Sequence, residues 1–267
     1  IDVKQSQIIH DIVEEIENAQ HEKPFRDIFI TSSTGAGKSV MFQLPSFLMH
    51  KNHQLLTIVI SPLIGLMNDQ VKNLQARGIN NVATINSNIT PMEKEEIQKR
   101  IHKKEIAILY ISPETLLNRA DIKLLIGEET KVGLFIVDEA HIVTTWGKAF
   151  RADYWYLGPY LQKLRKEMKF PIATFTATAI YGGEEDMYKE TRDSLGLLNP
   201  KFYLGQIKRN DIEMKIDSHP KELSTNEYRM AKFDFASLRL KSFIKNEKKI
   251  LVYFPTIPLI HQLRSEE

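Results

Sequence analysis

The sequence contains no cysteine, which excludes disulfide bonds, cysteine-ligated zinc and iron–sulfur clusters from all 267 residues. It also lacks any apolar run near the ~20 residues that span a bilayer, and its N-terminus lacks the basic-then-apolar order of a signal peptide. A strong excess of one charge is missing too, because 36 Lys and Arg face 34 Asp and Glu. These absences predict a protein of a reducing compartment without a membrane partner. Any basic surface for an anionic partner must be local.

Short apolar runs rich in β-branched residues recur along the first two thirds of the chain, and helix-like segments separate them. Buried parallel strands read as continuous apolar runs, so this alternation predicts an α/β fold with a parallel sheet covered by helices on both faces. The predicted strands are Ile28–Ile30, Thr57–Ile60, Val82–Ile85, Ala107–Ile111, Leu134–Val137 and Ile172–Phe175.

Helix positions follow from apolar spacing and from one capping signal. Residues 8–16 place isoleucines and a valine on one helical face, and residues 63–74 form a second apolar stripe. Thr90, Pro91 and Glu93 form the N-cap, first-turn proline and third-position glutamate of a capping box, so a helix begins there.

The pattern loosens after Leu198, which predicts a domain boundary. Residues 233–244 look helical, and Ile250–Phe254 reads as a buried strand. One strand with a helix or two cannot bury a core of its own. We therefore divide the chain into a domain at 1–204 and the incomplete beginning of a second domain at 205–267.

The strongest local motif is TGAGKS at 34–39, directly after the strand that begins at Ile28. Glycines let the backbone curl so that its N–H groups face a phosphate, and the helix that follows adds its positive end. Lys38 is placed to reach the β- and γ-phosphates of ATP, and the Ser39 hydroxyl to bind Mg²⁺. The phosphate-contacting residues are therefore Thr34, Gly35, Ala36, Gly37, Lys38 and Ser39. The alternative is a glycine turn without a ligand, and Ser32 departs from the strict pattern, which has glycine there.

A second motif supplies the carboxylates that a phosphate loop requires. The buried run Leu134–Val137 ends in Asp138, Glu139, Ala140 and His141. Asp138 is placed to hold Mg²⁺, and Glu139 to orient or deprotonate the attacking water. An acidic pair after a strand is usually a solvated loop, and a lone histidine is usually structural. Together with the phosphate loop, the catalytic interpretation is favoured.

The order of several motifs resembles one known family, the RecQ DNA helicases of superfamily 2. DEAH at 138–141 looks like helicase motif II, and VISPLIGLMNDQV at 59–71 is similar to motif Ia of RecQ enzymes. LYISPE at 109–114 and FTATA at 175–179 also match, the latter motif III. The segment HIVTTWGKAFRADY at 141–154 is similar to the aromatic-rich loop of these enzymes. The resemblance covers residues 28–212 and implies two RecA-like domains with ATP between them and single-stranded DNA across the top.

The resemblance also implies individual roles. Ser61 and Pro62 would contact nucleic-acid phosphates, while Thr176 and Thr178 would couple the γ-phosphate to motif II. Gln7 would be the adenine-reading glutamine upstream of the phosphate loop. Flat rings and a cation suit stacking on bases and holding a phosphate, a role predicted for Trp146, Phe150, Arg151 and Tyr154. Core packing is the alternative for these aromatic residues.

The resulting expectation is a Mg·ATP-dependent helicase motor that moves on single-stranded or partly duplex DNA. Such an enzyme would be cytoplasmic, or associated with a nucleoid or nucleus. The 267 residues alone are expected to bind ATP, hydrolyse it poorly and unwind nothing, because an arginine from the second domain should complete the site. Two alternatives stay open: an RNA helicase or remodelling translocase, and a non-catalytic nucleotide-sensing module of a larger assembly.

Overall fold

A computed structural model describes residues 4–117, 122–144, 153–178, 186–205 and 224–245, together with 213, 249, 251–253 and 260–261. The chain divides into two compact units, Ile1–Asp211 and Ile212–Glu267. This division falls a few residues beyond the boundary predicted at 204. Each unit is described by itself.

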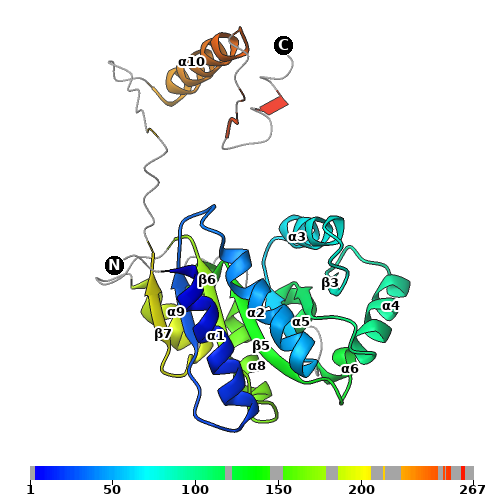
Figure 1. Cartoon of the computed structure of the whole chain (residues 1–267). Coiled ribbons are helices and arrows are strands. Elements are labelled where there is room, and N and C mark those ends of the chain that lie inside the picture. The colour runs from blue at the N-terminus through cyan, green and yellow to red at the C-terminus, as the bar shows by residue number, and fades with distance from the viewer. Residues whose placement is uncertain are drawn as a thin grey trace. The chain divides into compact units, whose positions relative to one another are not determined.

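The first unit is built on a seven-stranded sheet in which every strand pairing is parallel (Figure 1). The strand order is β3-β4-β2-β5-β6-β1-β7. The predicted α/β fold with a parallel sheet is thus confirmed. The strands are β1 Ile28–Thr31, β2 Leu56–Ile60, β3 Val82–Ile85, β4 Ile108–Ile111, β5 Val132–Asp138, β6 Ile172–Thr176 and β7 Lys201–Leu204.

Six strands arise from the apolar runs of the sequence and are almost completely buried. β7 was not predicted from the sequence, because Lys201–Leu204 lies at the sheet edge, is only partly buried and opens with a lysine. An edge strand needs no continuous apolar run, since neighbouring chain covers only part of it.

Helices cover both faces of the sheet, as predicted (Figure 1). One face packs against α1, α2 and α3, with Ile12, Phe42 and Met67 in its core. The other packs against α4, α5, α6, α8 and α9, with Ile101 and Leu161 in its core. Thr90 and Glu93 form the predicted capping box at the start of α4. The helices of the first unit are α1 Gln5–Gln20, α2 Lys38–His53, α3 Ile64–Ala76, α4 Pro91–His102, α5 Pro113–Leu117, α6 Lys123–Ile126, α8 Asp153–Leu164 and α9 Met187–Leu195, with the 3₁₀ helix η1 Ala140–Val143.

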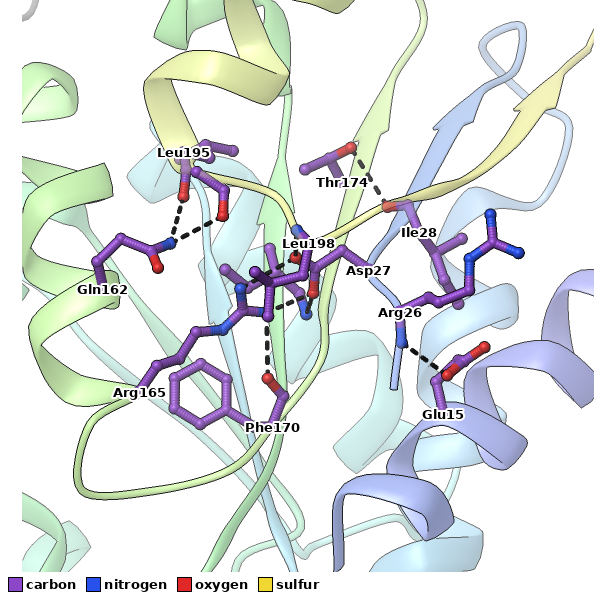
Figure 2. A network of polar contacts seen from close by, with 12 residues as sticks. Glu15, Arg26, Asp27, Ile28, Gln162, Arg165, Phe170, Thr174, Leu195 and Leu198 are labelled. Atoms are coloured by element: carbon purple, nitrogen blue, oxygen red, sulfur yellow. Dashed lines mark hydrogen bonds and ion pairs between the residues drawn. The ribbon is translucent and has the colours of Figure 1, made fainter. Parts of the chain in front are cut away.

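A buried ion pair lies at the amino-terminal ends of the strands and holds several elements together there (Figure 2). Asp27, which precedes β1 and is 0% exposed, forms a bidentate pair with Arg165, just beyond α8. Its oxygens also accept from the backbone N–H groups of Ile172 at 2.6 Å and Leu198 at 2.5 Å. Arg165 donates in addition to the carbonyl oxygen of Phe170 at 3.1 Å. One carboxylate thus joins β1, β6, the end of α8 and the chain that enters β7.

In the second unit the structure describes a long helix, α10 Thr225–Lys245, which contains the predicted helix at 233–244. The predicted buried strand at 250–254 is wrong where the structure describes it. Residues 251–253 form no strand, and Leu251 and Tyr253 are 76% and 85% exposed. A parallel strand requires a neighbour to pair with. An apolar run without such a neighbour stays exposed.

No helix among the residues described here is long and apolar enough to cross a membrane.

Candidate active site

All the predicted catalytic loops follow the carboxyl ends of strands and therefore lie on the same side of the sheet. Because every strand is parallel, the carboxyl ends of β1, β2, β5 and β6 open on the same side. Ligands of open α/β sheets bind outside the carboxyl ends of the strands. The phosphate loop and the acidic motif therefore meet where a nucleotide would be held.

The phosphate loop has the curled backbone that its glycines predict. Gly35 and Gly37 adopt φ angles of +85° and +75°, in the left-handed region that favours glycine. α2 begins directly afterwards, at Lys38. A Cβ atom added at Gly35 would meet nothing within 4 Å, so the loop has open space above it. A curled glycine loop followed by a helix N-terminus is the backbone arrangement that phosphate-binding sites use.

Lys38 and the acidic motif lie close enough to interact electrostatically. The Lys38 ammonium donates to the carbonyl oxygen of Ser32 at 3.1 Å, which folds the side chain back over the loop. Burial raises the pKa of Asp138 to about 6, and the charge of Glu139 adds to the rise. The Glu139 backbone N–H and the positive charge of Lys38 both lower that pKa. This interaction agrees with the strand order, in which the phosphate loop follows β1 and the acidic motif follows β5 on either side of β6.

The acidic motif is held in a special backbone conformation. Glu139 has a φ of +51°, which is uncommon for a residue with a side chain. Its backbone N–H donates to the Asp138 carboxylate at 3.0 Å. The turn presents both carboxylates at the carboxyl end of β5. Strain of this kind is concentrated at functional sites.

Motifs II and III are joined by a hydrogen bond between side chains. His141 Nδ1 lies 3.1 Å from Thr176 Oγ1 and 3.3 Å from the Glu139 carboxylate. The single hydroxyl proton of Thr176 goes to the Thr178 carbonyl oxygen at 2.8 Å, so His141 Nδ1 is the donor to Thr176. Burial lowers the pKa of His141 and favours its neutral form, with the charge of Lys38 adding to the effect and Glu139 opposing it.

Thr176 also contacts the phosphate loop, but through its backbone. Its carbonyl oxygen accepts from the Ser32 N–H at 3.0 Å. The Thr178 N–H donates to the Thr176 hydroxyl at 3.1 Å, so both threonines of motif III are in one hydrogen-bonded turn. The structure thus brings together Lys38, Glu139, His141, Thr176 and Thr178.

The glutamine that contacts the phosphate loop is Gln5, and not Gln7, which was predicted from the sequence. Gln5 Nε2 donates to the carbonyl oxygen of Ala36 at 2.6 Å and would lie 2.7 Å from a Cβ atom added at Gly37. The exposed Gln7 instead donates to Asp11 within α1 at 3.1 Å. Gln5 occupies the first turn of α1, three residues before the buried Ile8.

The residues predicted to bind nucleic acid divide into two groups. Ser61 and Pro62 are buried; Ser61 is only 2% exposed, and its N–H donates to the Ile111 carbonyl oxygen. Their position does not favour direct contact with a phosphate, because neither side chain reaches the surface. The exposed residue of this turn is Leu63. Trp146, Phe150 and Arg151 lie outside the described residues, and Tyr154 lies in α8 with its side chain undescribed.

The donor set fits magnesium and a triphosphate. The Ser39 hydroxyl at the start of α2 and the Asp138 carboxylate supply hard oxygen ligands, which Mg²⁺ prefers. No group of three or more His, Cys, Asp or Glu that could hold a metal occurs in the ranges given above. Mg²⁺ commonly takes one or two protein oxygens together with phosphate and water. The fold and the site together define a P-loop nucleotide-binding domain.

Comparison with known proteins identifies the family. The model of the DEAD/DEAH box helicase family matches residues 3–186, so the chain belongs to that family. It is RecQ-like within it. It is 33% identical over 192 residues to the ATP-dependent DNA helicase RecQ of Synechocystis sp., covering 72% of this chain and 38% of that protein. It is also 33% identical over 198 residues to RecQ of Haemophilus influenzae, covering 74% and 30%. The chain thus spans about a third of these relatives.

Solved structures support the fold. The DUF1998 helicase MrfA matches with a TM-score of 0.62 at 13% identity, covering 97% of this chain and 40% of that one. The helicase domain of Pyrococcus furiosus Hef matches with a TM-score of 0.52 at 16% identity, covering 76% and 38%. The RecA-like parallel sheet predicted from the sequence is the fold that these neighbours share.

Proposed function

We propose that this chain is the ATP-binding motor domain of a RecQ-like DNA helicase, which couples Mg·ATP hydrolysis to movement on single-stranded DNA. The observation that carries the proposal is the position of the glycine loop after β1 and of Asp138 and Glu139 after β5, at the same ends of the parallel strands that flank β6. A Mg–nucleotide site requires a lysine, a curled glycine loop and carboxylates together.

Each residue has a role that follows from its position. The backbone N–H groups of the loop and the Lys38 ammonium would hold the phosphates, and Ser39 and Asp138 would hold Mg²⁺. Bound Mg²⁺ neutralises the charge that develops on the transferred phosphoryl group. Glu139 would orient the attacking water and take its proton. His141, donating to Thr176, connects this carboxylate to motif III.

Adenine recognition belongs to Gln5 rather than Gln7 in this proposal. Gln5 already contacts the phosphate loop, whereas Gln7 is bonded within its own helix. A carboxamide can recognise a base edge because it has both a donor and an acceptor. This assignment replaces the one drawn from sequence.

DNA is proposed as the track because the curated relatives are named DNA helicases. RNA remains the competing track, since phosphate contacts do not distinguish the sugars. A non-catalytic nucleotide-sensing module is the competing class of protein. The intact set Lys38, Ser39, Asp138 and Glu139 supports a working enzyme instead.

The test measures nucleotide binding and ATPase activity with the complete protein. Wild type should bind Mg·ATP and hydrolyse it faster with single-stranded DNA than with RNA of the same length. Lys38→Ala should abolish nucleotide binding. The matched control is Lys51→Ala, which removes an exposed lysine near the end of the same helix and should bind like wild type. ATP binding without any turnover would favour the sensing module, and equal or greater stimulation by RNA would contradict the DNA assignment.

A further inference from the structure

A buried chain of polar side chains crosses three elements of the sheet face covered by α1, α2 and α3. Gln43 of α2 donates through Nε2 to Gln70 Oε1 of α3 at 3.1 Å. The same nitrogen donates to the hydroxyl of Tyr110 in β4 at 3.0 Å. An amide nitrogen has two protons, so Gln43 uses both to hold two partners at once. Gln43 is 8% exposed and Tyr110 is 2% exposed, which excludes most water from these bonds.

The inner end of this chain lies on the sheet face that Asp138 also follows, with β2 between the strands of the two residues. Tyr110 pairs with Val59 of β2, and Val59 pairs with Ile136 of β5, so the three side chains share a face. Asp138 is two residues beyond Ile136 and therefore follows the same face. The negative charge of Asp138 contributes to raising the pKa of Tyr110 to about 12, with burial as the larger cause. The phenol is therefore protonated at neutral pH, and it accepts from Gln43.

The outer end lies on the helix of the motif Ia segment. Gln70 is half-buried on α3, two residues after Asn68. Asn68 is itself fixed, because Asn86 beyond β3 donates to it at 3.2 Å. Two carboxamide contacts thus set the position of α3, one to the edge of the sheet and one to Gln43. A displacement of α3 would act on the Gln43 amide and, through it, on Tyr110.

We infer that Gln43 is a positioning residue that couples the position of α3 to the setting of Asp138, and that this link contributes to the stimulation of ATP hydrolysis by nucleic acid. This inference rests on the proposed function. It assigns a coupling route through the sheet face, in addition to the one through His141 and Thr176. Gln43 touches neither nucleotide nor metal in this assignment and acts only through its two partners.

The test uses the complete protein with Gln43→Leu, which preserves the size of the side chain and removes both hydrogen bonds. Steady-state ATPase is measured with and without single-stranded DNA, and DNA affinity by fluorescence anisotropy. The stimulation by DNA should fall about three- to tenfold, the range expected for a lost hydrogen bond. Basal turnover should stay within about twofold of wild type because Gln43 contacts neither nucleotide nor metal, and DNA affinity should stay within about twofold because neither hydrogen bond involves DNA.

Gln70 gives a matched pair of variants. Gln70→Leu removes the acceptor and should reduce stimulation like Gln43→Leu, whereas Gln70→Glu keeps an oxygen acceptor and should retain it. The double variant Gln43→Leu/Gln70→Leu should lose no more DNA stimulation than either single variant, since both substitutions remove the same hydrogen bond between Gln43 and Gln70. Gln70 is half-exposed, so its substitution should not prevent folding. If Gln43→Leu does not fold, Gln70→Leu and Gln70→Glu still show whether the hydrogen bond between Gln43 and Gln70 carries the coupling.

Ser46→Ala is the control for a purely structural effect. Ser46 is buried on the same helix, and its hydroxyl donates to Phe42 within α2 at 2.6 Å, so it contacts neither α3 nor β4 through this bond. Its DNA stimulation should equal that of wild type. The inference is overturned if Gln43→Leu is stimulated as strongly as wild type, or if it and Ser46→Ala lower basal and stimulated rates alike. A wild type that DNA does not stimulate would instead refute the proposed function.

Discussion

Replacing Arg165 by methionine should destabilise the domain strongly without touching the nucleotide site. Arg165 is 6% exposed and supplies two of the hydrogen bonds to the fully buried Asp27. Removing one partner of a buried pair leaves an uncompensated charge, which costs about 3–5 kcal/mol of unfolding free energy. For a domain of this size that corresponds to a fall in Tm of about 6–20 °C.

The assay is thermal and urea unfolding of wild type and variant. Lys163→Met is the matched control, because Lys163 is exposed in the last turn of α8. It should lower the free energy of unfolding by less than about 0.5 kcal/mol, as surface substitutions usually do. A loss of less than about 1 kcal/mol in Arg165→Met would refute the reasoning, since Asp27 would then not depend on its partner.

The loss in Arg165→Met should also depend on pH. Burial raises the pKa of Asp27 already, and Arg165 opposes this rise. Without Arg165 the folded-state pKa rises further, so the folded variant binds a proton more readily than its unfolded chain. Stability then falls as pH rises from the ordinary carboxyl value through the folded pKa. The deficit relative to wild type should therefore be smaller at low pH than at neutral pH.

A double variant separates the charge from the packing. Asp27→Asn removes the charge and keeps an oxygen acceptor for a backbone N–H. Arg165 Nε is buried and has no hydrogen-bond partner in the described ranges, so the wild-type pair is itself incompletely satisfied. We expect Asp27→Asn/Arg165→Met to recover about half of the stability lost by Arg165→Met. No recovery would show that shape, rather than charge, determines the loss.

Three further predictions concern the nucleotide site. Gln5→Ala should weaken ATP binding in a fluorescent-nucleotide titration, while Gln7→Ala should bind like wild type; the reverse result would restore the sequence-based assignment. Thr176→Val removes the hydroxyl bonded to His141 and should lower DNA-stimulated ATPase turnover about tenfold with little change in ATP affinity, so a loss of affinity instead would contradict its coupling role. Trp146→Ala should leave nucleotide affinity intact and reduce the DNA stimulation of ATPase, and equal stimulation would contradict the aromatic loop's role.

The strands and the phosphate loop could be predicted because each follows from a local pattern. A continuous apolar run such as Leu134–Val137 fits a strand buried on both faces, and glycines before Lys38 fit only a tight turn. β7 could not be predicted in this way, because pairing with β1 rather than hydrophobicity makes Lys201–Leu204 a strand. The run at 250–254 shows the reverse case, with hydrophobicity but no pairing where it is described.

The side-chain contacts of the site were harder to predict than its motifs. The sequence placed a glutamine before the phosphate loop, but choosing Gln5 over Gln7 requires the register of α1 against that loop. Ser61 was expected to offer donors to nucleic-acid phosphates from the turn after its strand. In the structure the turn buries it, and its N–H continues the pairing toward β4. Both outcomes depend on tertiary packing that spacing does not encode.

The strand order has one consequence for communication within the domain. β6 lies between β1 and β5, so the end of β6 separates the phosphate loop from the acidic motif. Thr176 bridges that gap with its carbonyl on one side and its hydroxyl on the other. The two contacts use different chemical groups of one residue. A side-chain substitution there can therefore cut the connection to His141 while the backbone bond to Ser32 is kept.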